Sequence, residues 1–321
     1  MPEAATVPTQ SPNHTFCDTR ASVDAALTTI HQYTKLAFDC EGRDLGEIGG
    51  RLSLISLRTI SDDLSSSISS GHKFLFDVIT LEREALLGVY AILESSAITK
   101  VVFNGRMDFS SLYHDHSIEL RNVIDLQIAD IKSRELRGEQ KSGRMRRLGS
   151  AIDRGELYQN QDLFDGMHKL SGLKKCAKEH IAFSDVPGPR FQHSQWFTRP
   201  LPAEYLHHAT EDVELIHQLY LHFHRRGYLT NPHLPGESMR YVSICKDRQS
   251  KMDEPFRKHG LLPLGIIGAE QVQGQETRRC GYCERALTKS CFSNKSWSAD
   301  VSKCNVCRAV GFQPFWLRHK R

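Results

Sequence analysis

Two acidic residues, Asp39 and Glu41, stand at the end of a short apolar run and are the first candidates for chemistry. The run, Lys35-Leu-Ala-Phe-Asp-Cys-Glu-Gly42, has the length and composition of a buried strand. Strand side chains alternate between faces, so Asp39 and Glu41 project from the same side. Burying two bare carboxylates side by side is costly, and clustered oxygen ligands attract divalent cations. The pair therefore predicts either a metal site or a solvated strand end.

Two further acids lie on other elements. Asp108 follows a strand predicted at 100–104 and stands at the start of a helix, where it is either a helix cap or a site residue. Asp212 lies at the margin of the apolar face of the clearest helical pattern, 204–224. Four carboxylates on separate elements suit two-metal hydrolysis, in which two divalent ions activate a water and stabilise the leaving oxygen. Such ligands favour Mg²⁺ or Mn²⁺ over Zn²⁺.

A histidine near Asp212 is the candidate general base. His208 precedes Asp212 by four residues, which puts both side chains on one face of a helix, one turn apart. There an imidazole can act as a general base toward a water nucleophile. His207 is the competitor, and would turn inward if the helix began later. A structural role is the alternative for either, since the chain has sixteen histidines.

Five of the nine cysteines are concentrated between 280 and 307. They include two CxxC pairs separated by twenty residues, Cys280 with Cys283 and Cys304 with Cys307. Two such pairs supply four thiolates to one tetrahedral Zn²⁺. About 40 residues bury little core, so zinc binding should supply most of the folding energy of this module. Phe292 and Trp297 are expected to form a miniature core or, alternatively, to stack on nucleic-acid bases.

The elements that must position these side chains follow from the hydrophobic pattern. Strands are predicted at 35–41, 51–58 and 73–78, with short connections typical of an antiparallel meander. Helices and strands then alternate: a helix at 81–95, a strand at 100–104, a helix from 107, a strand from 123 and a helix at 127–135. The alternation predicts parallel strands joined to the meander, hence an α/β fold with a mixed sheet and helices on its faces.

Two segments after the alternating part have different patterns. Helices are predicted at 170–181 and 204–224 from their apolar periodicity. Residues 141–147 carry four basic side chains in a segment expected to be a loop, either solvated or in contact with phosphate.

Charge is distributed unevenly along the 321 residues. The whole chain carries +4, but residues 278–321 hold ten Lys and Arg against two acids, so this segment is +8 and the rest is −4. A basic tail on an acidic-leaning body predicts an anionic partner, with nucleic acid the first candidate. No apolar run approaches the ~18 residues of a membrane helix, so no membrane partner is expected.

These patterns divide the chain into four parts. We expect a disordered leader at 1–24, a domain carrying the acids at 25–229, a linker at 230–277 and the zinc module with its basic tail at 278–321. The leader lacks the pattern of a signal peptide, and scattered single cysteines suit a reducing setting, so an intracellular location is expected.

Three motifs make residues of about 25–225 resemble the DEDD superfamily of 3′–5′ exonucleases, close to the RNase D and Werner-type branch. They are Phe38-Asp-Cys-Glu-Gly42 followed by Arg51-Leu-Ser-Leu-Ile-Ser56, the stretch from Lys100 to Leu112 with Asn-x3-Asp at its centre and Asn122 to Ala129 after it, and the stretch from Trp196 to Leu215. The resemblance implies an RNase H-like fold. It also implies that the metal-ligating acids are Asp39, Glu41, Asp108 and Asp212, with Asp125 in a supporting role.

The activity implied by the resemblance is metal-dependent 3′–5′ hydrolysis of RNA or single-stranded DNA with two Mg²⁺ or Mn²⁺ ions, and this substrate class favours a nuclear over a cytoplasmic location. One position departs from the pattern. The RNase D branch has Tyr-x3-Asp where this chain has His208, whereas a second branch has His-x4-Asp, which His207 fits. A non-catalytic RNA-binding scaffold in a silencing or RNA-processing complex is therefore the alternative.

The cysteine module resembles the small four-cysteine finger of fungal silencing adaptor proteins. The resemblance covers Cys-x2-Cys, a Phe-Ser and Trp region, and the second Cys-x2-Cys. It implies that the module recruits a partner, and it leaves RNA, DNA or protein open.

Overall fold

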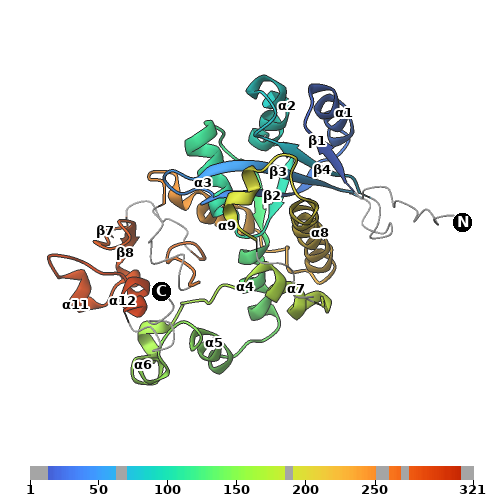
Figure 1. Cartoon of the computed structure of the whole chain (residues 1–321). Helices are drawn as coiled ribbons and strands as arrows, with labels where there is room; N and C mark the ends of the chain where they lie inside the picture. Colours follow the sequence, from blue (N-terminus) through green and yellow to red (C-terminus); the bar gives the residue numbers. More distant parts are fainter. Residues whose placement is uncertain (1–13, 63–70, 185–190, 251–259, 269–274, 312–321) are drawn as a thin grey trace, which may run out of the picture.

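A six-stranded mixed sheet forms the centre of the molecule (Figure 1). The computed structural model describes residues 14–62, 71–184, 191–250, 260–268 and 275–311. The strand order is β1-β4-β3-β2-β5-β6. The bounds are β1 (Thr15–Cys17), β2 (Lys35–Arg43), β3 (Arg51–Ile60), β4 (Lys73–Asp77), β5 (Thr99–Val102) and β6 (Val123–Asp125). β2, β3 and β4 pair antiparallel, and β5 and β6 add in parallel beside β2. The predicted meander and mixed sheet are both confirmed.

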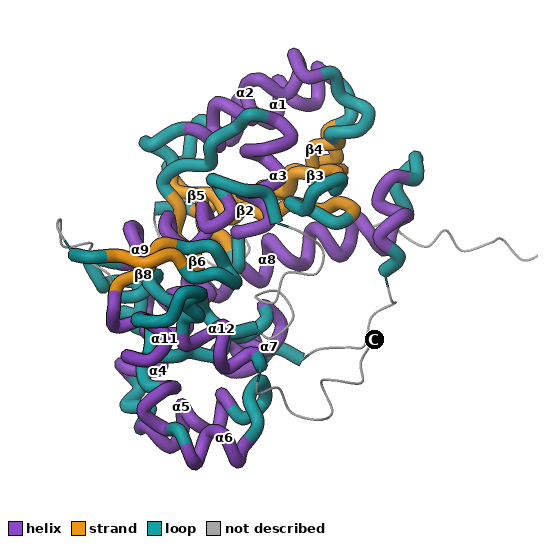
Figure 2. The backbone as a smooth tube through the Cα atoms, turned by 90° about the vertical axis from the view of Figure 1, so that its left-hand side faces the viewer, coloured by secondary structure: helices purple, strands orange, loops and turns teal. Residues whose placement is uncertain are grey.

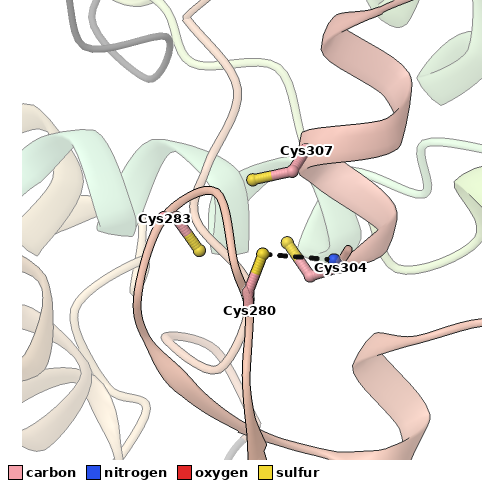
Figure 3. A group of neighbouring side chains, drawn as sticks. All are labelled: Cys280, Cys283, Cys304 and Cys307. Atoms are coloured by element: carbon pink, nitrogen blue, oxygen red, sulfur yellow. Dashed lines mark hydrogen bonds between the residues drawn. The ribbon is translucent and has the colours of Figure 1, made fainter. Parts of the chain in front are cut away.

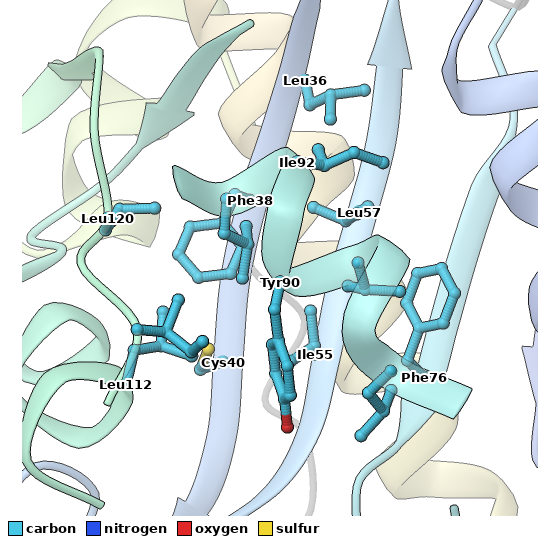
Figure 4. Close-up of a cluster of buried hydrophobic side chains, with 14 of the residues drawn as sticks. Leu36, Phe38, Cys40, Ile55, Leu57, Phe76, Tyr90, Ile92, Leu112 and Leu120 are labelled. Atoms are coloured by element: carbon cyan, nitrogen blue, oxygen red, sulfur yellow. The ribbon is translucent and has the colours of Figure 1, made fainter. Parts of the chain in front are cut away.

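Helices cover both faces of the sheet. One face packs against α1 (Arg20–Ile30), α2 (Arg83–Glu94) and α3 (Arg106–His116). The other packs against α4 (Leu126–Leu136), α7 (Leu173–Ile181) and the 23-residue α8 (Ala203–Arg225). Leu36, Phe38 and Cys40 of β2 belong to the first core (Figure 4). The alternation of β2 therefore turns Ala37, Asp39 and Glu41 toward the face that carries α8.

The first strand and helix lie where the sequence predicted a leader. β1 pairs in parallel with β4, and α1 begins with a capping box between Thr19 and Ser22. The prediction that residues up to 24 are disordered is therefore wrong for 15–24. Residues 1–13 lie outside the described part of the chain.

Part of the predicted linker is also structured. Residues 234–245 form α9 (Leu234–Val242) and the 3₁₀ turn η3 (Ser243–Cys245). Pro235 occupies the first turn of α9, where its missing N–H has no helical partner to lose. α9 packs against β6 and α3, and Tyr241 and Val242 are fully buried. This segment is thus an integral part of the α/β fold. Residues 251–259 and 269–274 of the predicted linker lie outside the described residues.

A small helical insert separates α4 from α7. It consists of α5 (Lys141–Leu148), α6 (Arg154–Gln159) and the 3₁₀ turn η1 (Gln161–Phe164). The basic stretch predicted as a loop is therefore a helix. Two of its three arginines are paired with acids: Arg144 contacts Asp165, and Arg147 contacts Glu139 and Glu179 at 2.6 Å each. These pairings oppose the idea that the stretch is a free phosphate-binding loop.

The C-terminal module consists of the hairpin β7 (Thr277–Arg279) and β8 (Ala286–Thr288), the 3₁₀ turn η4 (Lys289–Cys291), and helices α11 (Asn294–Trp297) and α12 (Asn305–Val310). It lies beside α5 and α6 in both views of the chain (Figures 1 and 2). The part of the basic tail at 312–321 lies outside the described residues. Among the helices that are described, none has the length and apolarity to span a membrane.

Candidate active site

β2 delivers the first two acids of the site. Asp39 and Glu41 lie on the face of the sheet opposite Leu36, Phe38 and Cys40. The next residue, Gly42, sits at a register shift between β2 and β3, and a Cβ there would lie 2.2 Å from the carbonyl oxygen of Arg51. Glycine is thus needed immediately after Glu41, because the two backbones approach too closely for any side chain.

α3 brings Asp108 to the same strand. Asp108 lies in the first turn of α3, is 6% exposed, and its Oδ1 accepts a hydrogen bond from the backbone N–H of Cys40 at 3.0 Å. Cys40 lies between Asp39 and Glu41, so this bond fixes the third carboxylate beside the first two. Asp108 is therefore not a simple helix cap. Gly105 occupies the N-cap position of α3 without a side-chain hydrogen bond, and the Asp108 carboxylate reaches across to β2 instead.

Asp125 positions the turn that carries Asp108. Its carboxylate accepts hydrogen bonds from the backbone N–H groups of Asn104 at 3.1 Å, Gly105 at 3.0 Å and Gln127 at 2.8 Å. Asp125 is fully buried, and burial raises the pKa of its carboxyl to about 6. This geometry agrees with the expected supporting role, because the Asp125 carboxylate accepts its hydrogen bonds from backbone N–H groups.

A second layer of this support comes from α9, which the sequence interpretation missed. The Tyr241 hydroxyl lies 2.5 Å from Gln127 Oε1 and 3.1 Å from Asn104 Oδ1. Ser238 Oγ accepts a hydrogen bond from the Asp125 N–H at 3.0 Å. The spacing of Leu234, Ser238 and Tyr241 is helical and was the available signal, but the prolines around it indicated a linker.

α8 supplies the fourth acid and the histidine. His208 Nε2 lies 3.8 Å from Glu41 Oε1, and His208 Nδ1 lies 3.7 Å from Asp212 Oδ1. The imidazole stacks on the ring of Phe191, with centroids 4.4 Å apart and an 11° interplanar angle. Burial lowers the pKa of His208, and the Lys174 charge lowers it further. His207 is exposed, so α8 brings His208 and not His207 into the site.

The four carboxyl groups repel one another strongly. Burial raises the pKa of Asp39 well above its ordinary value, and Asp108, Glu41 and Asp212 raise it further. Burial likewise raises the pKa of Asp108 and of Asp212 to about 7 each. These shifts mark a site where negative charge is concentrated in a poorly solvated space.

The residues present fit divalent cations. Glu41, His208 and Asp212 each offer a ligand atom within 4.8 Å of the others. Asp212 Oδ1 is buried and has no hydrogen-bond partner among the described residues. A buried carboxylate oxygen without a partner is costly, and a cation bound there would satisfy it. The chemistry of the donor set, mainly carboxylate oxygens, suits Mg²⁺ or Mn²⁺.

The four cysteines of the two CxxC pairs converge at the C-terminal module (Figure 3). Their sulfurs lie within 4.8 Å of one another, and the backbone N–H of Cys304 donates a hydrogen bond to Cys280 Sγ at 3.3 Å. In a tetrahedral site with Zn–S bonds of about 2.3 Å the sulfurs are about 3.8 Å apart, so this cluster fits one Zn²⁺. All nine cysteines are described and none forms a disulfide. Cys291 is buried outside the cluster.

The module shares its core with the helical insert. The module's buried residues pack in one cluster with Leu148, Ile152 and Phe164 of the insert; they are Cys280, Leu287, Cys291, Phe292, Cys304, Val306, Cys307 and Ala309. Phe292 and Trp297 form an edge-to-face pair with centroids 5.3 Å apart, which supports the miniature core over base stacking. The module is thus docked on the insert through an apolar contact.

Comparisons with known proteins agree with this geometry. Residues 15–227 match the 3′–5′ exonuclease family. Over 269 residues the chain is 24% identical to the mouse (Mus musculus) piRNA biogenesis protein EXD1; the alignment covers 74% of this chain and 42% of that protein, so the chain spans about two fifths of the relative's length.

Two solved structures have a similar fold. The Trypanosoma brucei RNase D structure aligns with a TM-score of 0.50 and 20% identity, covering 72% of this chain and 71% of that one. The same enzyme with GMP aligns with a TM-score of 0.56 and 18% identity, covering 86% and 82%. Because the family match spans more than half of the sequence, the chain belongs to the 3′–5′ exonuclease family of nucleases.

Proposed function

We propose that the chain removes nucleotides from the 3′ end of single-stranded RNA or DNA, using two divalent cations held by Asp39, Glu41, Asp108 and Asp212. The observation that carries this proposal is the convergence of the four acids, from β2, α3 and α8, on one site where Asp212 Oδ1 is buried and has no hydrogen-bond partner among the described residues. When bound, the cations would activate a water and stabilise the leaving 3′ oxygen.

The chain's own residues supply position and a proton acceptor. The Cys40 N–H holds Asp108 beside β2, and Asp125 holds the turn that precedes it. His208 is the proposed base, because its ring nitrogens lie 3.7–3.8 Å from Asp212 and Glu41 and Phe191 fixes the plane of the ring. A proton acceptor held at the edge of the carboxylate cluster is placed to accept the proton of an attacking water.

RNA is the substrate that we favour. The name of the mouse relative refers to a class of RNA, although the chain spans only part of that protein. We propose that the four cysteines hold one structural Zn²⁺ and that the module gives substrate or a partner a further contact surface. Its exposed Tyr282, with Lys303 Nζ 3.9 Å from the ring centroid, offers an aromatic and a cationic group at one place.

The proposal is tested with 5′-labelled RNA and DNA strands of one sequence, in the presence of Mg²⁺ or Mn²⁺. We expect a ladder that shortens from the 3′ end, and Asp39→Asn should abolish it. Asp24→Asn, an exposed acid of α1, is the matched control and should retain full activity. A wild-type chain that leaves both strands intact with either metal would refute the proposal.

The alternative of a non-catalytic RNA-binding scaffold predicts a different result in the same assay. It rests on the His208 departure from the Tyr-x3-Asp pattern. The scaffold predicts tight binding of the strands without any shortening. The intact set of four acids favours catalysis, since a binding surface for a polyanion gains nothing from four clustered carboxylates.

A further inference from the structure

An exposed pair of arginines lies next to the carboxylates. Arg43 is the last residue of β2 and faces Arg51, the first residue of β3, directly across the strand pair. Both are exposed. Strand alternation puts Arg43 on the same face as Asp39 and Glu41, about 7 Å beyond Glu41. A positive group therefore follows the two acids along one strand.

Both guanidinium groups lie over one aromatic ring. The Arg43 Cζ is 5.5 Å and the Arg51 Cζ 5.1 Å from the ring centroid of Phe197, a half-buried residue at the end of the 3₁₀ turn η2 (His193–Phe197). Cation–π contacts of this kind hold the guanidinium planes without using their N–H donors. The donors of both arginines thus stay available for an anion.

The backbone immediately before Phe197 is held by hydrogen bonds. The Ser53 hydroxyl, at the register shift of β3, donates a hydrogen bond to the Trp196 carbonyl at 2.5 Å. Arg199 donates to the same carbonyl at 2.8 Å and forms two 2.6 Å hydrogen bonds with Asp77. A rigid support of this kind reduces the entropy lost when a ligand binds.

The pairing of two like charges needs compensation. Like charges directly opposite each other in a sheet are destabilising. Neither Arg43 nor Arg51 forms an ion pair with a carboxylate in the described parts of the chain, whereas Arg58, Arg147 and Arg199 each do. An anion bound between Arg43 and Arg51 would relieve this repulsion.

We propose that Arg43 and Arg51, supported on Phe197, form a binding site for the phosphodiester backbone of a single strand, next to the carboxylates. This proposal takes its ligand, a nucleic-acid strand, from the proposed function. When the phosphate to be cleaved lies at Glu41, the neighbouring phosphates of the same strand must lie along one side of the site. Guanidinium groups suit phosphate because their planar donors bind it in a bidentate manner. The arginines contact the phosphate backbone and not the bases, so the binding of RNA and the binding of DNA should both depend on them.

Binding of fluorescent RNA and DNA oligonucleotides by the full chain tests the site. The parent protein carries Asp212→Asn to block hydrolysis, and a salt titration compares it with the same chain carrying Arg43→Gln and Arg51→Gln. Losing two phosphate contacts should reduce the slope of log K against log salt by about 1.4, and should weaken binding about 25-fold at 0.1 M salt. Arg83→Gln is the matched control, an exposed arginine that lies over Tyr90 on α2, and should change neither quantity.

A variant that keeps both positive charges controls for a loss of binding caused by misfolding. Arg43→Lys with Arg51→Lys should retain most of the salt slope, because Lys still contacts phosphate as a point charge. An unchanged slope in the Gln variant, or an equal loss in the Arg83→Gln control, would overturn the proposal.

Activity assays separate this inference from the proposed function. The two Gln substitutions in the otherwise wild-type chain should raise KM for an oligonucleotide far more than KM for bis(p-nitrophenyl) phosphate, a diester that has no neighbouring phosphate. If the otherwise wild-type chain binds strands through these arginines but never cleaves them, the proposed function fails and this site stands. If cleavage is robust and the salt slope is unchanged, this site fails alone.

Discussion

The backbone N–H of Cys40 donates a hydrogen bond to Oδ1 of Asp108 at 3.0 Å, which ties the acid of α3 to the strand between Asp39 and Glu41. Two substitutions of Asp108 should separate its effect on activity from its effect on the stability of the fold. Asp108→Asn keeps an oxygen for Cys40 and removes a repelling charge, so activity should be lost while the fold remains as stable or becomes more stable. Asp108→Ala leaves the buried N–H unpaired and should lower the free energy of unfolding by about 1–3 kcal/mol.

Denaturant unfolding without divalent cations, together with the strand-shortening assay, measures both quantities. Equal stability of the Ala and Asn variants would show that the bond to Cys40 contributes nothing.

Tyr241 on α9 supports the turn before Asp108 from outside the region matched to the family. Tyr241→Phe removes the hydroxyl that lies 2.5 Å from Gln127 Oε1, leaving that oxygen without this partner. We expect a loss of about 1–3 kcal/mol of stability and a roughly tenfold lower kcat, since small displacements of catalytic groups are costly. Tyr158→Phe, at a residue that is 79% exposed, is the control. The prediction fails if kcat is equal in both variants.

Zinc should stabilise the helical insert as well as its own module, because Val306 and Ala309 share a core with Leu148 and Phe164. If the four cysteines hold the proposed zinc ion, Cys304→Ser should abolish its binding and speed amide hydrogen exchange over 145–167. Cys291→Ala alters the same core without removing a ligand and should keep its zinc. Slow exchange over 145–167 in the zinc-free variant would contradict shared folding.

His217 on α8 should make the fold sensitive to acid. Burial lowers the pKa of this imidazole from 6.5 to about 4, and the nearby Arg58 charge lowers it further, while Glu214 opposes them. Between pH 6.5 and 4 the unfolded chain therefore binds a proton that the folded chain does not. The contribution is fully present above pH 6.5 and is lost as the pH falls toward 4, by on the order of 1–3 kcal/mol.

Unfolding free energies of the wild-type and His217→Gln chains across this range test the sign. The variant should show the shallower fall, and the exposed His193→Gln serves as the control for removal of a histidine. A variant that loses stability as steeply as the wild type would contradict the prediction.

The sequence predicted the elements with strong local periodicity and missed those that depend on distant partners. β2, β3 and α8 lie within two residues of their predicted bounds, because their apolar patterns are long and regular. β1 has only three residues and exists through pairing with β4, nearly sixty residues later. A three-residue strand has no periodicity to detect.

Residue type and spacing were enough to predict the candidate residues of the site, but not every choice among them. The structure brings Asp39, Glu41, Asp108, Asp212 and His208 together, but the spacing alone could not choose between the two histidines. The basic stretch at 141–147 predicted either a solvated loop or phosphate contact, yet Asp165 pairs with Arg144, and Glu139 and Glu179 pair with Arg147, across distances that a sequence does not reveal. Arg43 and Arg51 went unnoticed because only the register of β2 against β3 makes them neighbours.

The most direct test of the proposed two-metal site is the shortening rate of a 5′-labelled RNA, measured against Mn²⁺ concentration for the wild-type and Asp212→Asn chains. We predict that the wild-type rate rises from zero with Mn²⁺ and that the variant shows at least a hundredfold lower rate at saturation, on the order seen when a transition-state charge partner is removed. An equal rate in the Asp212→Asn chain, or wild-type shortening that does not depend on Mn²⁺ or Mg²⁺, would contradict a metal site at Asp212.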